Sequence, residues 1–409
     1  MTPRERARKI LNFEEADRPG IDLGATRMTG TSAWTYVALK RALGIGGGVT
    51  RIPDLFQMLA EVEEAVLDAL GCDFQAVPDL DMPYGLTRNG WVDYTFWDGQ
   101  TFQVPSGFRP HVEENGDLLV GNGPEWMESG SGPVARMPSG GRYFDAIDVA
   151  NLTDTFEVPH IDEADWNLPG PLDQAFLDSE RGRIGALYDT TDRALVATPP
   201  FGLCAGYGGL FQWGMKMALD ADHCRRYMVA QGEAAAARAR QYLDAVGEYL
   251  DVVVLSGADY GTQDRECFRP ELFGQCMAPG WEVVCDAVHE YDDVKTWVHT
   301  CGSVPGLIGY MVEAGVDILN PLQWGAAGMD RQWMKDAYGD RLVFWGGGIN
   351  TQNTFPFGSA DDVRREAKEC LDIYAPGGGF VVNPIHNIQA DVPVENILAL
   401  YETAREYRY

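Results

Sequence analysis

The sequence predicts an α/β protein, a (β/α)8 TIM barrel with a β-rich insertion after the second strand. Eight short apolar runs alternate with longer amphipathic runs along the 409 residues, which is the pattern of a parallel sheet wrapped by helices. No glycine-rich dinucleotide-binding motif follows an early strand, so a doubly wound sheet is the weaker alternative. Because barrels often exceed the usual domain length, we expect residues 1–409 to form a single domain.

The apolar runs and the amphipathic runs between them assign the elements in order. The expected strands are 21–24, 72–77, 194–198, 251–255, 295–299, 316–320, 342–345 and 379–383. The expected helices are 53–70, 221–249, 270–289, 304–314, 330–338, 360–374 and 393–407. Ser303, Ser359 and Asp391 are suitable N-cap residues for three of these helices.

The segment 86–150 interrupts this alternation. Residues 91–96 alternate in polarity and lead into a turn at 97–100, and Asn115-Gly116 marks a second hairpin. We expect a β-rich insertion that caps the barrel mouth and does not fold as an independent domain.

The composition limits the partners of the protein. The 61 acidic residues against 32 basic residues give a net charge of −29, which disfavours nucleic acids and anionic membranes. The eight cysteines are scattered and form no CxxC pair, as in proteins of reducing compartments. No apolar signal segment or membrane-spanning run is present, so we expect a cytoplasmic protein.

The most informative motif is His299-Thr300-Cys301, at the end of the fifth expected strand. One residue between an imidazole and a thiol lets both reach one point where the chain leaves the strand. A thiolate with a neutral imidazole suits zinc, although the pair alone could also pack in the core. His386 follows the eighth strand, and functional groups gather at this end of a barrel. The shared position favours a metal site.

Other polar residues follow neighbouring strands at the same end of the barrel. They are Asp259 and Tyr260 after the fourth strand, Asn320 and Gln323 after the sixth, Asn350 and Gln352 after the seventh, and Asn387 after the eighth.

These stretches resemble the uroporphyrinogen decarboxylase superfamily, in its corrinoid-dependent methyltransferase branch. The resemblance is strong over 250–409, and the barrel fold of that family agrees with the pattern above. The stretches that carry it are His299-Thr300-Cys301-Gly302-Ser303, residues 313–321, Phe344-Trp345-Gly346-Gly347 and His386-Asn387-Ile388-Gln389.

Two departures from the family narrow the expected activity. Tetrapyrrole decarboxylases carry an arginine-rich N-terminal segment, whereas residues 22–30 contain only Arg27. The methylcobamide:coenzyme M methyltransferases bind zinc through His-x-Cys and a later cysteine, but no cysteine follows Cys370. The resemblance therefore implies that His386 takes the place of the third ligand, beside His299 and Cys301.

This ligand change affects the charge of the expected zinc site. One thiolate and two imidazoles leave zinc formally at +1, whereas two thiolates and one imidazole make it neutral. The stronger Lewis acid suits a donor whose leaving group is an oxygen. We therefore expect a methyltransferase that moves a methyl group from a small methoxylated donor to the Co(I) corrinoid of a partner protein.

The expected roles follow from this assignment. A partner must carry the corrinoid, because the chain lacks the Asp-x-His-x-x-Gly motif that binds cobalamin. A homodimer is also consistent with the resemblance. The expected catalytic residues are Asp259 and Gln352, and the expected substrate-binding residues are Tyr260, Asn320, Gln323, Asn350 and Asn387.

Three alternatives remain open. The protein could transfer a methyl group from a methyl-corrinoid to a thiol or folate. It could be a lyase or decarboxylase without a metal. It could also be a binding protein without catalysis.

Overall fold

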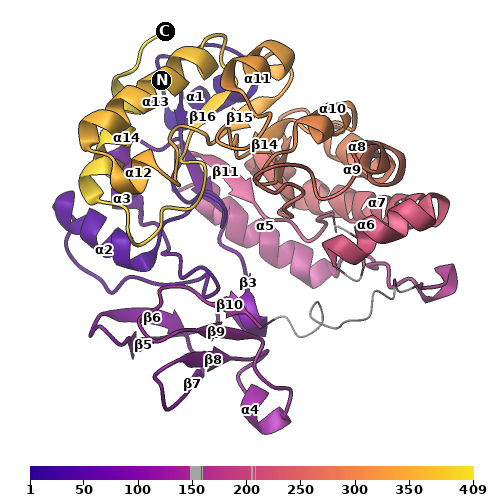
Figure 1. Cartoon of the computed structure of the whole chain (residues 1–409), viewed down its shortest axis with the longest axis horizontal. Helices are drawn as coiled ribbons and strands as arrows, with labels where there is room; N and C mark the ends of the chain where they lie inside the picture. Colours follow the sequence, from indigo (N-terminus) through magenta and orange to yellow (C-terminus); the bar gives the residue numbers. More distant parts are fainter. Residues whose placement is uncertain (148–157, 159, 204–205, 208) are drawn as a thin grey trace.

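The computed structural model describes residues 1–147, 158, 160–203, 206–207 and 209–409, so the last three residues of the predicted insertion, 148–150, lie outside it. The predicted barrel is confirmed (Figure 1). Eight parallel strands form one sheet in the order β1-β16-β15-β14-β13-β12-β11-β2. Their bounds are β1 Gly20–Ile21, β2 Phe74–Ala76, β11 Ala194–Ala197, β12 Val252–Ser256, β13 Lys295–His299, β14 Ile318–Asn320, β15 Val343–Trp345 and β16 Phe380–Val382.

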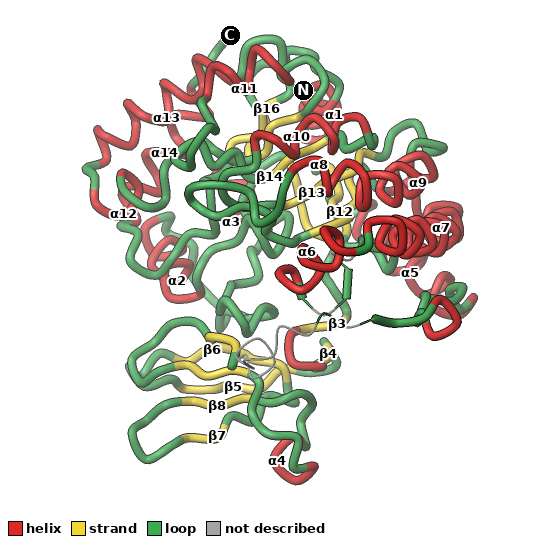
Figure 2. The backbone as a smooth tube through the Cα atoms, turned by 45° about the vertical axis from the view of Figure 1, so that its right-hand side comes forward, coloured by secondary structure: helices red, strands yellow, loops and turns green. Residues whose placement is uncertain are grey.

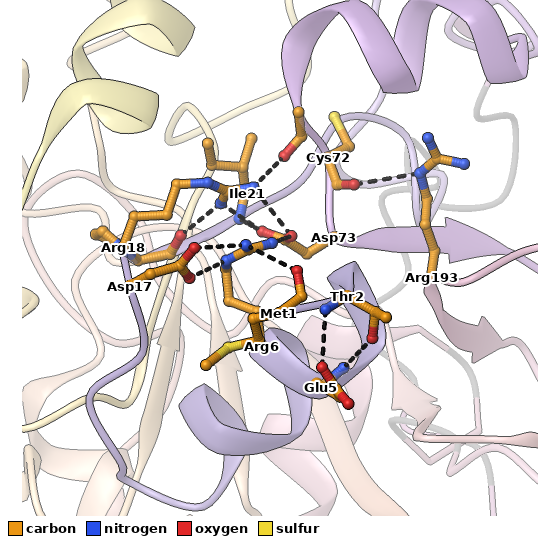
Figure 3. A network of polar contacts seen from close by, with 12 residues as sticks. Met1, Thr2, Glu5, Arg6, Asp17, Arg18, Ile21, Cys72, Asp73 and Arg193 are labelled. Carbon is orange, nitrogen blue, oxygen red and sulfur yellow. Dashed lines mark hydrogen bonds and ion pairs between the residues drawn. The ribbon is translucent and has the colours of Figure 1, made fainter.

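The first and last strands of that order, β1 and β2, meet at Asp73. The backbone N–H of Asp73 donates to the carbonyl of Ile21 at 2.8 Å, and its buried carboxylate accepts the N–H of Ile21 at 2.9 Å. Arg6 and Arg18 each donate to the same carboxylate at 2.7 Å (Figure 3). Main-chain and side-chain hydrogen bonds thus close the sheet.

The same arrangement recurs before two other strands. Asp251 precedes β12 and accepts the N–H of Leu195 on β11 at 3.0 Å. Asp317 precedes β14 and accepts the N–H of Thr296 on β13 at 2.8 Å. Each aspartate satisfies a main-chain donor at the start of its neighbouring strand, and buried donors require such a partner.

Helix α1 (Pro3–Leu11) seals the N-terminal end of the barrel. Its Ile10 carbonyl accepts the N–H of Gly379, which directly precedes β16, and its Arg8 pairs with Asp251 at 2.7 Å. The apolar side chains of α1 join one buried cluster with those that point into the barrel. That cluster is Ala7, Ile10, Leu11, Ala25, Phe74, Ala194, Val196, Val252, Val254, Trp297, Ile318, Val343, Trp345 and Val381. With the N-terminal end sealed, the C-terminal ends of the strands form the open mouth.

The other helices surround the sheet (Figure 2). Their bounds are α2 Ala33–Ala42, α3 Glu64–Leu70, α5 Gln174–Tyr188, α6 Leu210–Leu219, α7 Ala221–Val246, α8 Pro270–Leu272, α9 Ala278–Val288, α10 Pro305–Glu313, α11 Arg331–Tyr338, α12 Thr354–Phe357, α13 Ala360–Tyr374 and α14 Val394–Glu406. The expected helices did not include α1, α2, α5, α6 or the short α12.

The predicted helix 53–70 is wrong for its first part, since only α3 is helical. Asp54 accepts the N–H groups of Gln57 and Leu59, and Met58 has a positive φ of 55°. These local hydrogen bonds offer the backbone an alternative to a helix. The chain therefore turns back on itself over these residues, and only the last two turns of the predicted helix form, as α3.

One of the three predicted caps is confirmed. The Ser359 hydroxyl accepts the N–H of Asp362, and the Asp362 carboxylate accepts the N–H of Ser359. This capping box starts α13. The other two caps are wrong, because α10 and α14 begin after Val304 and Pro393. Ser303 instead donates its hydroxyl to the Ala327 carbonyl at 2.7 Å.

The insertion is β-rich and antiparallel, as predicted. Its strands are β3 Asp81–Met82, β4 Leu86–Thr87, β5 Trp91–Thr95, β6 Thr101–Pro105, β7 His111–Val112, β8 Leu118–Val120, β9 Ala135–Met137 and β10 Asp145–Ala146, with a short helix α4, Trp126–Ser129. Both predicted hairpins form, with β5 paired to β6 and β7 to β8. Trp34 of α2 packs edge-on against Phe96 and Phe102. The insertion thus packs on the barrel through α2, and its role as a cap stays a prediction.

Two composition-based expectations can be compared with the structure. The seven described cysteines are free, and Cys204 lies outside the described residues. Among the described residues, no helix combines the length and apolar character that crossing a membrane requires.

We expect Asp73→Ala to lower the free energy of unfolding by about 3–5 kcal/mol, because it leaves two arginines and the Ile21 N–H without their buried partner. Urea unfolding monitored by circular dichroism measures this. The matched control is Glu248→Ala, which breaks the exposed pair with Arg181 and should cost less than about 1 kcal/mol. Equal effects of the two substitutions would contradict the assigned role of Asp73.

Asp22, directly after β1, predicts a pH-dependent stability. Burial raises the pKa of Asp22 to about 6. The hydrogen bonds from Trp345 and from the Ala25 N–H lower this pKa, but burial has the larger effect. The folded state therefore binds the proton more tightly than the unfolded state does. The wild-type free energy of unfolding should fall by roughly 2–3 kcal/mol, relative to Asp22→Asn, as pH rises from about 4 to 6. Urea titrations across that range measure the difference, and a constant difference would contradict the prediction.

Candidate metal centre at the barrel mouth

Asp259, His299 and Cys301 meet at the mouth of the barrel, after β12 and β13. One potential ligand atom from each lies within 4.8 Å of the others. His299 Nε2 lies 3.4 Å from Cys301 Sγ and 3.3 Å from Asp259 Oδ1. The structure therefore brings together both residues of the His-x-Cys motif and adds a carboxylate from the preceding strand's loop.

Asn320 orients the imidazole of His299. The parallel register pairs His299 with Asn320, and His299 Nδ1 lies 2.6 Å from Asn320 Oδ1. The amide of Asn320 in turn donates to the Trp345 carbonyl at 2.9 Å, so its oxygen must accept the proton of Nδ1. This arrangement leaves Nε2 as the nitrogen that faces Cys301 and Asp259.

Two loops lock Cys301 in place. Asp259 Oδ1 accepts the Cys301 N–H at 2.8 Å, and Gln323 Oε1 accepts the Gly302 N–H at 2.7 Å. Gly302 has a φ of 89°, and a Cβ there would collide with the backbone of Gly261. Only glycine allows this close approach, so the position after Cys301 fixes the direction of the thiol.

The charges around Nε2 favour a cation. Burial lowers the pKa of His299, but the hydrogen bonds to Asp259 and Cys301 outweigh it and raise that pKa to about 10. Burial raises the pKa of Asp259, but its hydrogen bond and charge interaction with His299 bring it below the usual value. One imidazole, one thiolate and one carboxylate form a donor set that zinc accepts. The residues present therefore fit a zinc ion.

His386 does not belong to this group of three, although it lies near it. Its Nδ1 donates to the Asn387 carbonyl at 3.3 Å, which leaves Nε2 available. Burial lowers the pKa of His386, and the positive charge of nearby His299 lowers it further. Asp259, which the sequence analysis assigned to catalysis, completes the cluster, while metal binding by His386 stays a prediction.

Several predicted substrate-binding residues form contacts that hold the loops. Asn350 Oδ1 accepts the N–H of Gln352 at 2.8 Å, and Asn387 Oδ1 accepts the N–H of Gly30 at 2.5 Å. Tyr260 is fully buried against Phe273 and other aromatic rings. Gln352, which we expected to be catalytic, is exposed, and its catalytic role stays a prediction. Contact of these residues with a substrate stays a prediction.

A cavity that the sequence pattern did not indicate lies at the ends of β1, β2 and β11. Its lining includes Arg27, Arg88 and Asp79, and burial raises the pKa of Asp79. Asp79 follows an expected strand, so the rule that selected Asp259 would also have selected it.

Two contacts connect this cavity with the metal centre. Gly30 lines the cavity and binds Asn387, the neighbour of His386. Met28 lies between two lining residues, and its Cε is 3.5 Å from the position that a Cβ would take on Gly257, in the loop that carries Asp259. A ligand in the cavity would therefore lie beside the loops of the metal centre.

Comparisons with known proteins agree with this architecture. A family model described as "Uroporphyrinogen decarboxylase (URO-D)" matches residues 155–407, more than half of the chain. A solved structure, "methyltransferase from Methanosarcina mazei", superimposes with a TM-score of 0.55 at 16% identity and covers 99% of each chain. At this identity the likeness is one of fold. No curated protein matches the chain.

The geometry predicts that Cys301→Ala removes the one zinc ion held by this centre, and that Asn320→Leu weakens zinc binding at this centre by about 10–100-fold, because it releases the imidazole from its orienting partner. Zinc content after dialysis and competition with a chromogenic chelator measure both effects. The matched control is Cys267→Ala, which removes a partly buried cysteine outside the cluster and should leave the affinity unchanged. The same number of tightly bound zinc ions per chain in Cys301→Ala as in the wild type would exclude this centre.

Proposed function

Because the chain belongs to the uroporphyrinogen decarboxylase family, we propose that it is a zinc-dependent methyltransferase of that fold. It would move a methyl group from a small methoxylated donor to the Co(I) corrinoid of a partner protein. The observation that carries the proposal is the cluster of Asp259, His299 and Cys301 at the barrel mouth. The solved structure with the same fold is that of a methyltransferase, which supports this choice within the family.

The mouth is poorly suited to a tetrapyrrole with several carboxylates. Arg27, the only arginine in the segment after β1, pairs with Asp54 at 3.1 Å. Arg88 pairs with Glu61. The cavity lining contains these two carboxylates together with Asp79 and Asp81. The local charge would repel a polyanion, which argues against the decarboxylase reaction and for a donor that carries little negative charge.

The zinc ligands would be His299, Cys301 and Asp259, with His386 as a further nitrogen donor. Bound zinc would supply a Lewis acid that stabilises the developing negative charge on the donor oxygen. The donor oxygen would keep the electron pair of the methyl–oxygen bond, and the partner's Co(I) would supply the electron pair that binds the methyl group.

The chain's own residues would prepare this centre. Asn320 holds the tautomer and direction of His299, and Gln323 holds the loop after Cys301. The side chain of Asp259 is 57% exposed and its carboxylate is a harder ligand than a thiolate. Asp259 is therefore the group that an incoming donor oxygen would most readily replace. Such replacement would leave one thiolate as the only anionic ligand, so a bound zinc ion would carry the net positive charge that an oxygen leaving group needs.

One observation favours a second candidate, methyl transfer from a corrinoid to a thiol. With Asp259 bound, the set of one imidazole, one thiolate and one carboxylate makes zinc formally neutral. Zinc with one imidazole and two thiolates is also formally neutral. A neutral zinc centre leaves a bound thiolate nucleophilic, as transfer to a thiol requires. The two candidates differ in whether Asp259 stays bound during the reaction.

The test combines the purified zinc-loaded protein, a corrinoid protein reduced to Co(I) and a panel of methanol and methoxylated aromatics. We expect the Co(I) absorbance to disappear with at least one donor, and Cys301→Ala to slow this by more than about 100-fold. Cys267→Ala serves as the matched control and should retain the rate.

The same mixture run in the other direction separates the two candidates. Demethylation of a methylated corrinoid protein by thiols, with no reaction from any oxygen donor, would replace the first candidate by the second. No methyl transfer in either direction with cognate corrinoid proteins would contradict both.

A further inference from the structure

A second cluster of ligating side chains lies at the start of the outer helix α7, apart from Cys301. It comprises His160, Asp220 and His223, whose potential ligand atoms lie within 4.8 Å of one another. Asp220 and His223 begin α7, which follows α6 on one flank of the barrel (Figure 1). Because α7 leads back to the start of β12, its first turn lies on the mouth side.

The cluster is held by contacts from four segments. Asp220 caps α7, because its Oδ1 accepts the His223 N–H at 3.3 Å. The cap does not use Oδ2, the second carboxylate oxygen. His223 is buried, and its Nε2 lies 2.9 Å from the hydroxyl of Tyr207. The rings of His160 and His223 lie 4.6 Å apart. Two imidazoles and a carboxylate therefore converge without a thiol.

A positive charge already occupies this cluster. The Lys216 ammonium lies 2.8 Å from His160 Nδ1 and 3.7 Å from Asp220 Oδ2. Lys216 is itself buried, with 8% exposure, and burying an ammonium is costly unless acceptors surround it. The acceptors of the cluster thus stabilise a cation on the mouth side of α6 and α7.

We infer that His160, Asp220 and His223 form a second divalent-cation site, selective for zinc and similar borderline ions. Two imidazole nitrogens and one carboxylate oxygen are the donors that such ions take at about 2.0–2.2 Å. The ligand atoms lie within 4.8 Å of one another and would move closer together around a bound ion. Lys216 competes with the ion, because an ammonium and a dication repel each other at this range.

An ion in this site would fasten the segment around His160 to α7. That segment already binds the helix through Glu163 and Arg226 at 2.7 Å and through Trp166, whose ring packs edge-on against Tyr227. The cation would add a stronger link to these two contacts. This inference does not depend on the proposed methyl transfer.

The test isolates this site in the Cys301→Ala background, which lacks the thiolate of the mouth centre. With Zn²⁺ as the probe, we expect one ion per chain by calorimetry, and none after His160→Ala is added. The matched control His111→Ala removes an exposed histidine of the insertion and should leave the binding intact. Zinc affinity that is unchanged by His160→Ala would overturn the inference.

A second variant distinguishes a cation site from a purely structural network. Lys216→Leu removes the competing ammonium and should tighten zinc binding by about tenfold or more. Loss of zinc affinity in Lys216→Leu, with the fold intact by circular dichroism, would also overturn the inference. His160 is exposed, so its substitution should not itself unfold the chain.

Discussion

The structure depends on closure of the parallel sheet between β1 and β2, which the buried carboxylate of Asp73 makes favourable. A sheet of eight short strands cannot bury its inner face until its first and last strands meet, and a main-chain donor at that seam must find a partner. Asp73 supplies the partner for Ile21, and two arginines neutralise the buried charge. Closure also determines the second layer of packing, because α1 reaches Asp73 and Asp251 through Arg6 and Arg8 while its apolar face fills the N-terminal end.

The metal centre follows from the register of that closed sheet. Parallel pairing of β13 with β14 sets His299 beside Asn320, and the amide of Asn320 is itself anchored on β15 through Trp345. Three adjacent strands therefore determine which nitrogen of His299 faces the mouth. The loops add the rest, since Asp259 binds the backbone of Cys301 and brings a carboxylate to the thiol. A rigid barrel with ligands on its strand ends and loops gives a centre of defined geometry.

Acidic residues also outnumber basic residues locally, in the cavity at the barrel mouth. The carboxylates Asp54, Glu61, Asp79 and Asp81 outnumber Arg27 and Arg88 in the cavity beside the centre, and both arginines are engaged in ion pairs. A cation at the cluster of Asp259, His299 and Cys301 would relieve that negative potential. The local charge would therefore disfavour a polyanion in this cavity, which is one reason for proposing methyl transfer from a nearly neutral donor.

The sequence by itself determined the elements whose signal is local. Alternating apolar runs located the eight strands, hairpin turns located the insertion, and one-residue spacing at a strand end identified His299 and Cys301. The tertiary structure decided the features that depend on residues far apart in the chain. Asp259 reaches Cys301 across 42 positions, and Asp79 enters the cavity wall only after β2 pairs with β11. The helix predicted over 53–63 fails for both kinds of reason, because Asp54 forms local hydrogen bonds that turn the chain and Leu59 pairs with Ser32 of a distant segment. Local propensity reports the backbone preferences of neighbouring residues, whereas closure of the barrel selects which distant polar groups must satisfy one another.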